Sequence, residues 1–267
     1  MNAIIAESDR KELQLAKNLL ENPGIAIKIT NILGMPIEKG IKKLPKNWSD
    51  KIGEVTKTAL LKAAEAAIFT IKDIPGEESS NKWHKLGVAA SGSVGGFFGI
   101  AALAIELPIS TTIMLRSIIE IARSQGESIT CPETKLACLE VFALGGNSKS
   151  DNNAESGYYT VRALVAKSIS KAAEFIAEKG LAEEGAPILV KLIANISQRF
   201  GIQITEKAAA QAIPAIGAAG GAIINTIFID HFQDMAKGHF IVRKLERVYG
   251  KETIKKLYEE LPNIMQT

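Results

Sequence analysis

Residues 86–105 read LGVAASGSVGGFFGIAALAI, and residues 208–229 read AAAQAIPAIGAAGGAIINTIFI. Neither stretch contains a charged side chain, and both are rich in alanine and glycine. A helix of twenty residues is about 30 Å long, which matches the thickness of the hydrocarbon layer of a membrane. Glycines four residues apart, as in Gly92/Gly96 and Gly217/Gly221, leave bare backbone on one helix face. We therefore predict two glycine-rich helical hairpins at the centre of the fold.

The rest of the chain also reads as helical, because no stretch alternates polar and apolar residues between hairpin turns. Apolar residues recur every three or four positions between residues 50 and 72. Further helices are predicted at residues 7–21, 155–179 and 186–200, and Thr205 is a candidate N-cap for the next one. We predict an all-α, multi-helix bundle in which residues 1–48 form an N-terminal helical arm and residues 49–267 form the main helical domain.

The composition excludes several classes of protein. The chain has 267 residues, a formal net charge of +3 and two cysteines. That charge is too small for a dedicated nucleic-acid binder, and neither a Walker A motif nor a GxGxxG loop predicts a nucleotide site. Two cysteines cannot build a disulfide framework. The first residues, MNAIIAESDRKELQ, lack the basic and apolar regions of a signal peptide, so we expect a cytoplasmic protein that is not secreted.

Several long blocks resemble the EcsC protein family. They read WHKLGVAASGSVGGFFGIAALAIELPISTTIMLRSIIEIARSQGE (83–127), CPETKLACLEVFALGG (131–146), AESGYYTVRALVA (154–166) and EKAAAQAIPAIGAAGGAIINTIFIDHFQDMAKGHFIVRKLERVYG (206–250). The resemblance covers roughly residues 50–255. The family takes its name from a protein encoded beside a bacterial ABC transporter. The resemblance therefore implies a bacterial protein that faces the cytosol and is linked to membrane processes, and it supplies no catalytic residues.

The glycine-rich runs need a compensating role, because each glycine inside a helix costs about 1 kcal/mol relative to alanine. Close helix packing, insertion into lipid, and a cavity for an apolar ligand are three such roles. Complete spanning is disfavoured, because alanine, glycine and serine are only weakly apolar on insertion scales. The residues that would contact lipid or a partner are Gly92, Gly95, Gly96, Phe97, Phe98, Gly99, Gly217 and Gly221.

A lysine-rich segment at residues 39–51 is a second candidate for membrane contact. Lys42, Lys43 and Lys46 would be attracted to anionic headgroups, and Trp48 would lie at the interface between headgroups and hydrocarbon. The alternative is an ordinary solvated surface, which is the commoner meaning of a single charge run.

A polar cluster, DHFQDMAKGH at residues 230–239, carries four of the five candidate metal ligands. On a helix, Asp230 and Asp234 share a face. These two residues, together with His231, His239 and Glu106, could hold Zn²⁺ or Mn²⁺, which would activate a bound water for hydrolysis. No diagnostic spacing such as HExxH supports the site. The alternative is a network of buried ion pairs, in which Glu106 or an aspartate such as Asp230 pairs with Arg116 or Arg243.

The favoured hypothesis is a non-enzymatic protein that associates peripherally with the inner face of the membrane. It would bind lipid or a membrane protein through the glycine-rich helices and the basic surfaces, without a cofactor. Two alternatives stay open: a metal-dependent hydrolase that uses the Asp/His/Glu cluster, and a soluble adaptor that docks on a transporter component. The sequence does not decide between catalysis and binding, nor between a monomer and a homo-oligomer.

Overall fold

The computed structural model describes residues 5–21, 24–34, 36–70, 99–146, 157–179, 187–212 and 217–263. Across these ranges the chain forms α-helices and one short 3₁₀ turn, and no strand. The prediction of an all-α, multi-helix bundle is thereby confirmed. The two predicted glycine-rich hairpins stay predictions, because residues 71–98 and 213–216 lie outside the described ranges.

The described helices follow one another closely along the chain. Their bounds, in chain order, are α1 (Glu7–Leu20), α2 (Ile25–Leu33), α3 (Glu38–Ile41), α4 (Trp48–Thr70), α6 (Gly99–Ser124), α7 (Pro132–Glu140), the 3₁₀ turn η1 (Val141–Ala143), α8 (Gly157–Lys179), α9 (Pro187–Gln211), α10 (Gly217–Tyr249) and α11 (Lys251–Glu260).

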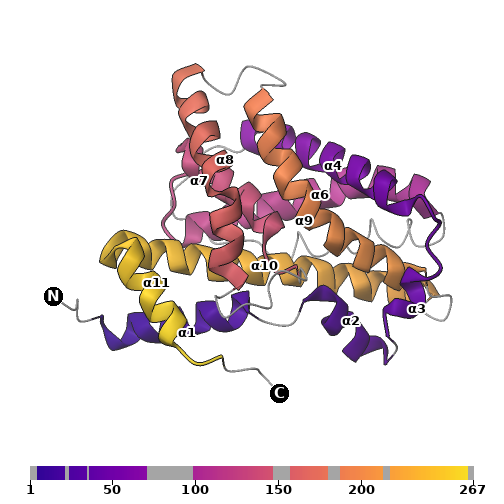
Figure 1. Ribbon diagram of the computed structural model, residues 1–267, viewed down its shortest axis with the longest axis horizontal. Helices are drawn as coiled ribbons and strands as arrows, with labels where there is room; N and C mark the ends of the chain where they lie inside the picture. Colours follow the sequence, from indigo (N-terminus) through magenta and orange to yellow (C-terminus); the bar gives the residue numbers. More distant parts are fainter. Residues whose placement is uncertain are drawn as a thin grey trace.

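Helix α10 is the central element of the bundle. Figure 1 shows it extending along the molecule, with α1 and α11 on one side and α8, α9 and α4 on the other. Helices α1, α2, α6, α9 and α11 all pack against it. Its buried side chains include Phe228, Phe232 and Phe240, and such a helix, apolar on most of its circumference, is stable only inside other helices. Phe142 of η1 contacts Phe232 with ring centroids 5.2 Å apart, which ties the turn after α7 to the same core.

Helix α9 runs without interruption from Pro187 to Gln211, whereas the sequence predicted a first helix ending at residue 200 and a new one capped by Thr205. Thr205 is wrong as an N-cap. Its hydroxyl donates a 2.8 Å hydrogen bond to the carbonyl of Gly201, four residues earlier in the same helix. Threonine makes this bond inside helices as well as at their ends, so the residue type alone did not mark a boundary.

The N-terminal helices pack on the rest of the bundle. Helix α1 lies along α10, and Leu13, Ala16 and Leu20 are buried there in the same hydrophobic core as the remaining helices. At Gly238 of α10 an added Cβ would lie 2.7 Å from Leu20 Cγ and 3.0 Å from the Ala16 carbonyl oxygen. The close approach of α1 to α10 therefore depends on a glycine that the sequence did not single out.

Candidate membrane-facing surface and polar pocket

The lysine-rich segment lies on the surface at α3 and at the beginning of α4. Lys39, Lys42, Lys43, Lys46 and Lys51 are all exposed. The segment is held firmly against α9, because α3 packs there and an added Cβ on Gly40 would overlap the backbone of Ala209. The lysines therefore project from a fixed piece of backbone.

Trp48 does not have the position that the sequence predicted. Its side chain is 7% exposed and belongs to the hydrophobic core, together with Ile37 and Ile52. Trp48 is the first residue of α4, and burying it attaches the lysine-rich segment to the bundle. The indole ring gains more free energy by packing in the core than by facing solvent among the lysines. Trp48 is therefore not an interfacial anchor.

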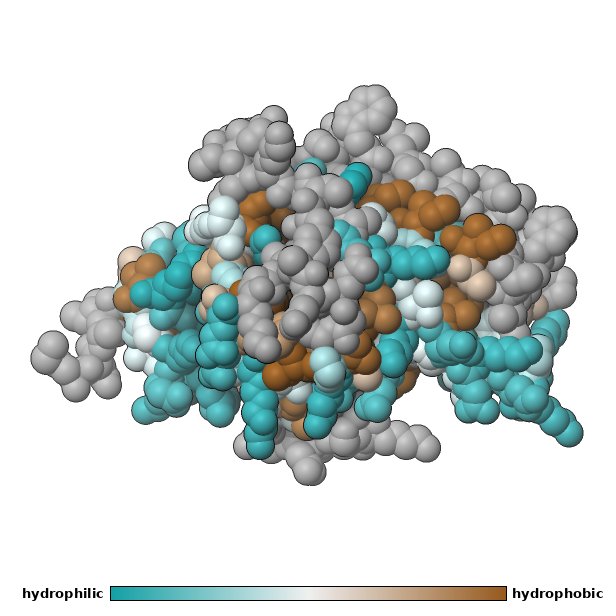
Figure 2. Space-filling model, turned by 90° about the horizontal axis from the view of Figure 1, so that it is seen from above, coloured by the Kyte–Doolittle hydropathy of each residue, from teal (hydrophilic) through white to brown (hydrophobic). Residues whose placement is uncertain are grey.

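The first half of α6 presents isoleucines to solvent. Ile105 is 72% exposed and Ile109 is 51% exposed, and the two lie one helical turn apart. Helix α6 packs beside α4, the helix that carries the end of the lysine-rich segment. Figure 2 shows hydrophobic residues gathered in groups between hydrophilic ones on one face of the molecule.

The glycine candidates are only partly covered by the structure. Gly92, Gly95, Gly96, Phe97 and Phe98 lie outside the described residues. Gly99 is the first residue of α6 and Gly217 is the first residue of α10, and both lie in the uncharged runs. Gly221 is buried in the first turns of α10.

Buried ion pairs are present, and the partners of Glu106 and Arg243 differ from the predicted ones. Glu106 of α6 accepts a 2.7 Å hydrogen bond from Lys207 Nζ of α9, and neither side chain is more than 5% exposed. Arg243 pairs with Glu127 instead, through a 2.9 Å bond from its Nε. Arg116 is exposed on α6, and Asp230 is half-buried on α10.

The five candidate metal ligands are not brought together. Glu106 is engaged by Lys207, and Asp234 pairs with Lys28 at 3.2 Å. His239 Nδ1 lies 3.0 Å from the Tyr158 hydroxyl. Within the described ranges, no three His, Cys, Asp or Glu side chains form a group that could hold a metal ion.

Both histidines of the cluster are fully buried. Burial, reinforced by the charge of Lys28, lowers the pKa of His231 to about 3. Burial and the nearby Arg162 and Arg243 hold the pKa of His239 well below 6.5. Both rings are therefore neutral at pH 7.

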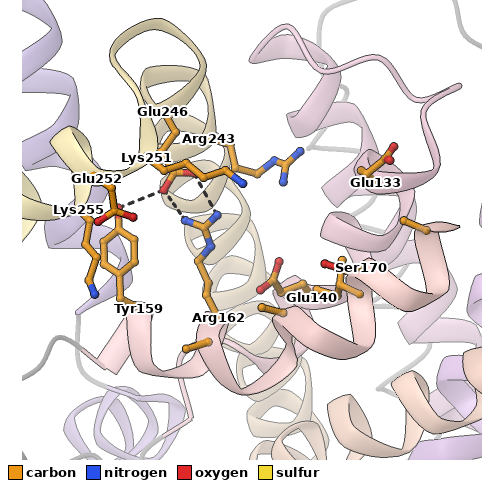
Figure 3. A pocket seen from close by; sticks show the side chains of 14 residues that line it. Glu133, Glu140, Tyr159, Arg162, Ser170, Arg243, Glu246, Lys251, Glu252 and Lys255 are labelled. Atoms are coloured by element: carbon orange, nitrogen blue, oxygen red, sulfur yellow. Dashed lines mark hydrogen bonds and ion pairs between the residues drawn. The ribbon is translucent and has the colours of Figure 1, made fainter.

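The sequence did not single out a charged network where α7, α8, α10 and α11 meet (Figure 3). Arg162 of α8 donates two hydrogen bonds to Glu246 of α10, at 2.7 and 3.1 Å. Tyr159 donates a third bond to Glu246 at 3.2 Å. Opposite, Glu127 accepts bonds from Arg243, Arg247 and, at 2.9 Å, Thr134. Although burial acts against it, the bond and charge of Arg243 keep the pKa of Glu127 below its usual value.

Tyr159, Arg162, Arg243 and Glu246 of this network line an open pocket of about 370 Å³. Glu140, at the end of α7, lines it and is 4% exposed. Burial raises the pKa of Glu140 to about 7, and the nearby Arg162 and Arg243 act in the opposite direction. Glu140 is a single charge within the apolar stretch LACLEVFALGG, residues 136–146. This lone charge in an apolar stretch was the one signal in the sequence that could have identified Glu140 as a residue of the site.

None of the helices among the described residues is long enough and apolar enough to cross a membrane. In comparisons with known proteins, the sequence model of the EcsC protein family matches residues 7–245. The match confirms the resemblance and begins farther towards the N-terminus than the sequence blocks indicated. No curated protein and no solved structure matches the chain.

Proposed function

Because the chain belongs to the EcsC protein family, we propose that it is a membrane-associated, non-enzymatic helical protein that binds anionic lipid at the inner face of the membrane. The observation that carries this proposal is the pairing of an exposed apolar helix face with an exposed lysine-rich segment. The apolar face consists of Ile105 and Ile109 on α6, and the lysine-rich segment spans residues 39–51.

The apolar face supports insertion into the headgroup layer. Fully burying an isoleucine side chain is worth about 1.5–3 kcal/mol, so Ile105 and Ile109 gain free energy when lipid covers them. The uncharged residues 86–98 directly precede α6 in the chain. Shallow insertion requires no helix that crosses the bilayer.

The lysines support electrostatic attraction to the same surface. A cation near an anionic membrane contributes about 1 kcal/mol, and this contribution decreases within a Debye length. Gly40 and Trp48 fix the segment against α9 and the core, so little conformational entropy is lost when the lysines meet headgroups. Weak apolar insertion and weak electrostatic attraction together give stable but reversible binding.

Vesicle co-sedimentation tests the electrostatic part. We expect the protein to pellet with vesicles of phosphatidylcholine and phosphatidylglycerol, less with phosphatidylcholine alone, and less at high salt. Replacing Lys42, Lys43 and Lys46 by glutamine is expected to lower binding at least tenfold. The matched control replaces Lys11, Lys171 and Lys237 by glutamine. These lysines are also exposed, and replacing them removes the same amount of charge. Equal losses in the two triple variants would mean that only net charge matters and would refute the lysine-rich surface.

The apolar part has its own variant pair. Ile105→Ser together with Ile109→Ser is expected to weaken binding to anionic vesicles, whereas Leu164→Ser on α8, where the side chain is 62% exposed, is not. If the unaltered protein pellets with neither kind of vesicle, lipid binding is refuted. Recovery of one integral membrane protein from detergent extracts would then favour the adaptor alternative.

A further inference from the structure

The pocket between α7, α8, α10 and α11 contains none of the residues assigned to membrane binding. Its volume of about 370 Å³ lies within the range of roughly 300–1,000 Å³ that small-molecule sites occupy. Figure 3 shows Lys251 and Arg243 on one side of this space and Glu140 with Ser170 on the other. We call the side with Lys251 and Arg243 the cationic wall, on which Glu246 and Glu252 also lie, and the side with Glu140 the acidic wall.

The acidic wall has an unused hydrogen-bonding group. The Glu140 side chain is 6% exposed, and its carboxyl group lies 3.7 Å from His239 Nε2. That distance is too long for a hydrogen bond. His239 Nε2 is itself buried without a partner. A buried carboxyl group without a donor is costly, so a donor or cation that enters the pocket has a large favourable interaction to gain.

The cationic wall is held in place by its own ion pairs. Glu127 accepts bonds from Nε and one terminal nitrogen of Arg243, and an arginine has five N–H groups in all. The guanidinium is thus oriented and still has a donor to offer. Lys251 adds a mobile ammonium from the first residue of α11. Ala166 and Ile169 of α8 add apolar side chains to the lining.

We infer that this pocket binds a small zwitterion, with its phosphate or carboxylate on Lys251 and Arg243 and its ammonium on Glu140. The ammonium supplies the donors that Glu140 lacks, and the anionic group meets cations that are already oriented. A plain anion would leave Glu140 without a partner, and a plain cation would leave Lys251 without one. The inference is independent of the proposed membrane function, since no residue of the lysine-rich segment or of the apolar face on α6 lines the pocket.

Calorimetric titration with O-phosphoethanolamine tests the inference on the full chain. We expect saturable binding, and at least tenfold weaker binding by inorganic phosphate and by ethanolamine, each of which carries one of the two charges. Lys251→Gln and Glu140→Gln are each expected to weaken binding at least tenfold. Lys256→Gln is the matched control, because Lys256 is exposed on the same helix and does not line the pocket.

The source of the zwitterion is tested separately. If the zwitterion is a lipid headgroup, the protein binds vesicles that contain phosphatidylethanolamine, and O-phosphoethanolamine competes with this binding. Lys251→Gln then abolishes the competition. If it is a free solute, Lys251→Gln leaves all vesicle binding unchanged. The inference is overturned if O-phosphoethanolamine does not bind, if phosphate binds equally well, or if Lys256→Gln has the same effect as Lys251→Gln.

Discussion

Lys207 is the only lysine among the largest side chains that the described structure buries completely, and its ammonium is 2.7 Å from the Glu106 carboxylate. It also lies 5.1 Å from the centre of the Phe228 ring, so its charge has both an ionic and an aromatic neighbour. Pairs of this kind are strongly coupled, because removing one member leaves the other as an unpaired charge in the interior.

We predict that Lys207→Met destabilises the protein by about 3–5 kcal/mol, since Glu106 is left without its cation. The double variant Glu106→Gln/Lys207→Met is expected to recover part of that loss. Urea unfolding followed by circular dichroism measures both. If the single variant loses no more than the exposed Lys256→Met, the buried pair does not exist in solution.

Glu140 gives a prediction about pH. Its pKa of about 7 in the folded protein is above the ordinary value of 4.5, so the folded state holds this proton more tightly than the unfolded state. The resulting stabilisation is complete below pH 4.5 and is lost as the pH rises through 7. Glu140→Gln removes the cost of ionisation, so at pH 8 it is expected to be more stable than the unaltered protein by up to about 3 kcal/mol.

The control for Glu140 is Glu133→Gln on the same helix. Glu133 is exposed, and its pKa is lowered, chiefly by the hydrogen bond from the Cys131 thiol. Glu133→Gln should therefore gain no stability relative to the unaltered protein as the pH rises. Unfolding free energies of both variants between pH 5 and pH 8 provide the measurement. A Glu140→Gln difference that stays constant over this range would contradict the raised pKa.

The sequence pointed to some of these buried residues but to none of the residues with which they pair. Glu106 stands at the end of an uncharged run, so a buried role was predicted. Its partner, Lys207, is 101 positions away in a segment, ITEKAAAQ, that resembles a solvated helix surface. The prediction for Trp48 was wrong for a similar reason. The five nearby lysines indicate that one side of the segment faces solvent, but they do not show what the other side packs against.

At the scale of helices, glycine decides how closely two elements approach. Gly238 of α10 faces α1, where an added Cβ would lie 3.0 Å from the backbone oxygen of Ala16. Gly53 of α4 is exposed, and nothing lies within 4 Å of the position of its Cβ. The two glycines are both inside helices and differ only in what surrounds them.

Alanine substitutions at these two positions are expected to have opposite effects. Gly53→Ala should stabilise the protein by about 0.5–1 kcal/mol, because alanine favours the helix and meets no obstacle. Gly238→Ala should destabilise it by about 1–3 kcal/mol, because overpacking against α1 exceeds the same intrinsic gain. Thermal unfolding of both variants checks the signs. Stabilisation by Gly238→Ala would mean that α1 does not lie against α10.

Helix identity was largely predictable, whereas helix ends and contacts were not. The apolar period of three to four residues identified α4 and α8 nearly to their ends, since that pattern is set by burial on one face. The uncharged runs drew attention to Gly92 and Gly221, whereas Gly40 and Gly238, where a neighbouring helix lies too close for a Cβ, stand beside charged residues. Close approach depends on which helix lies opposite, and that is a property of the fold.

At the scale of the molecule, one hydrophobic core includes residues from α1 through α11. Lys17 of α1 donates hydrogen bonds of 2.7 and 2.6 Å to the carbonyls of Tyr258 and Leu261, at the end of α11. A lysine at this position compensates carbonyl groups that have no partner within their own helix. The family match also begins at residue 7, so α1 lies within the matched region.

Deleting residues 1–23 is therefore expected to destabilise the whole protein. The deletion uncovers the face of α10 that Leu13, Ala16 and Leu20 bury, and it leaves the end of α11 without Lys17. We expect a lower melting temperature and stronger binding of a hydrophobic dye at 25 °C. An unchanged melting temperature would show that α1 is the separate arm that the sequence predicted.

The bonds from Lys17 to α11 join positions 241 and 244 residues apart. A ribosome adds roughly 5–20 residues per second, so α1 leaves the exit tunnel about 10–50 s before the segment that completes its environment. During most of that interval, until α10 has been synthesised, its apolar side lacks the helix on which it packs. Transient shielding by a chaperone, or late docking after release, is the expected consequence for biosynthesis.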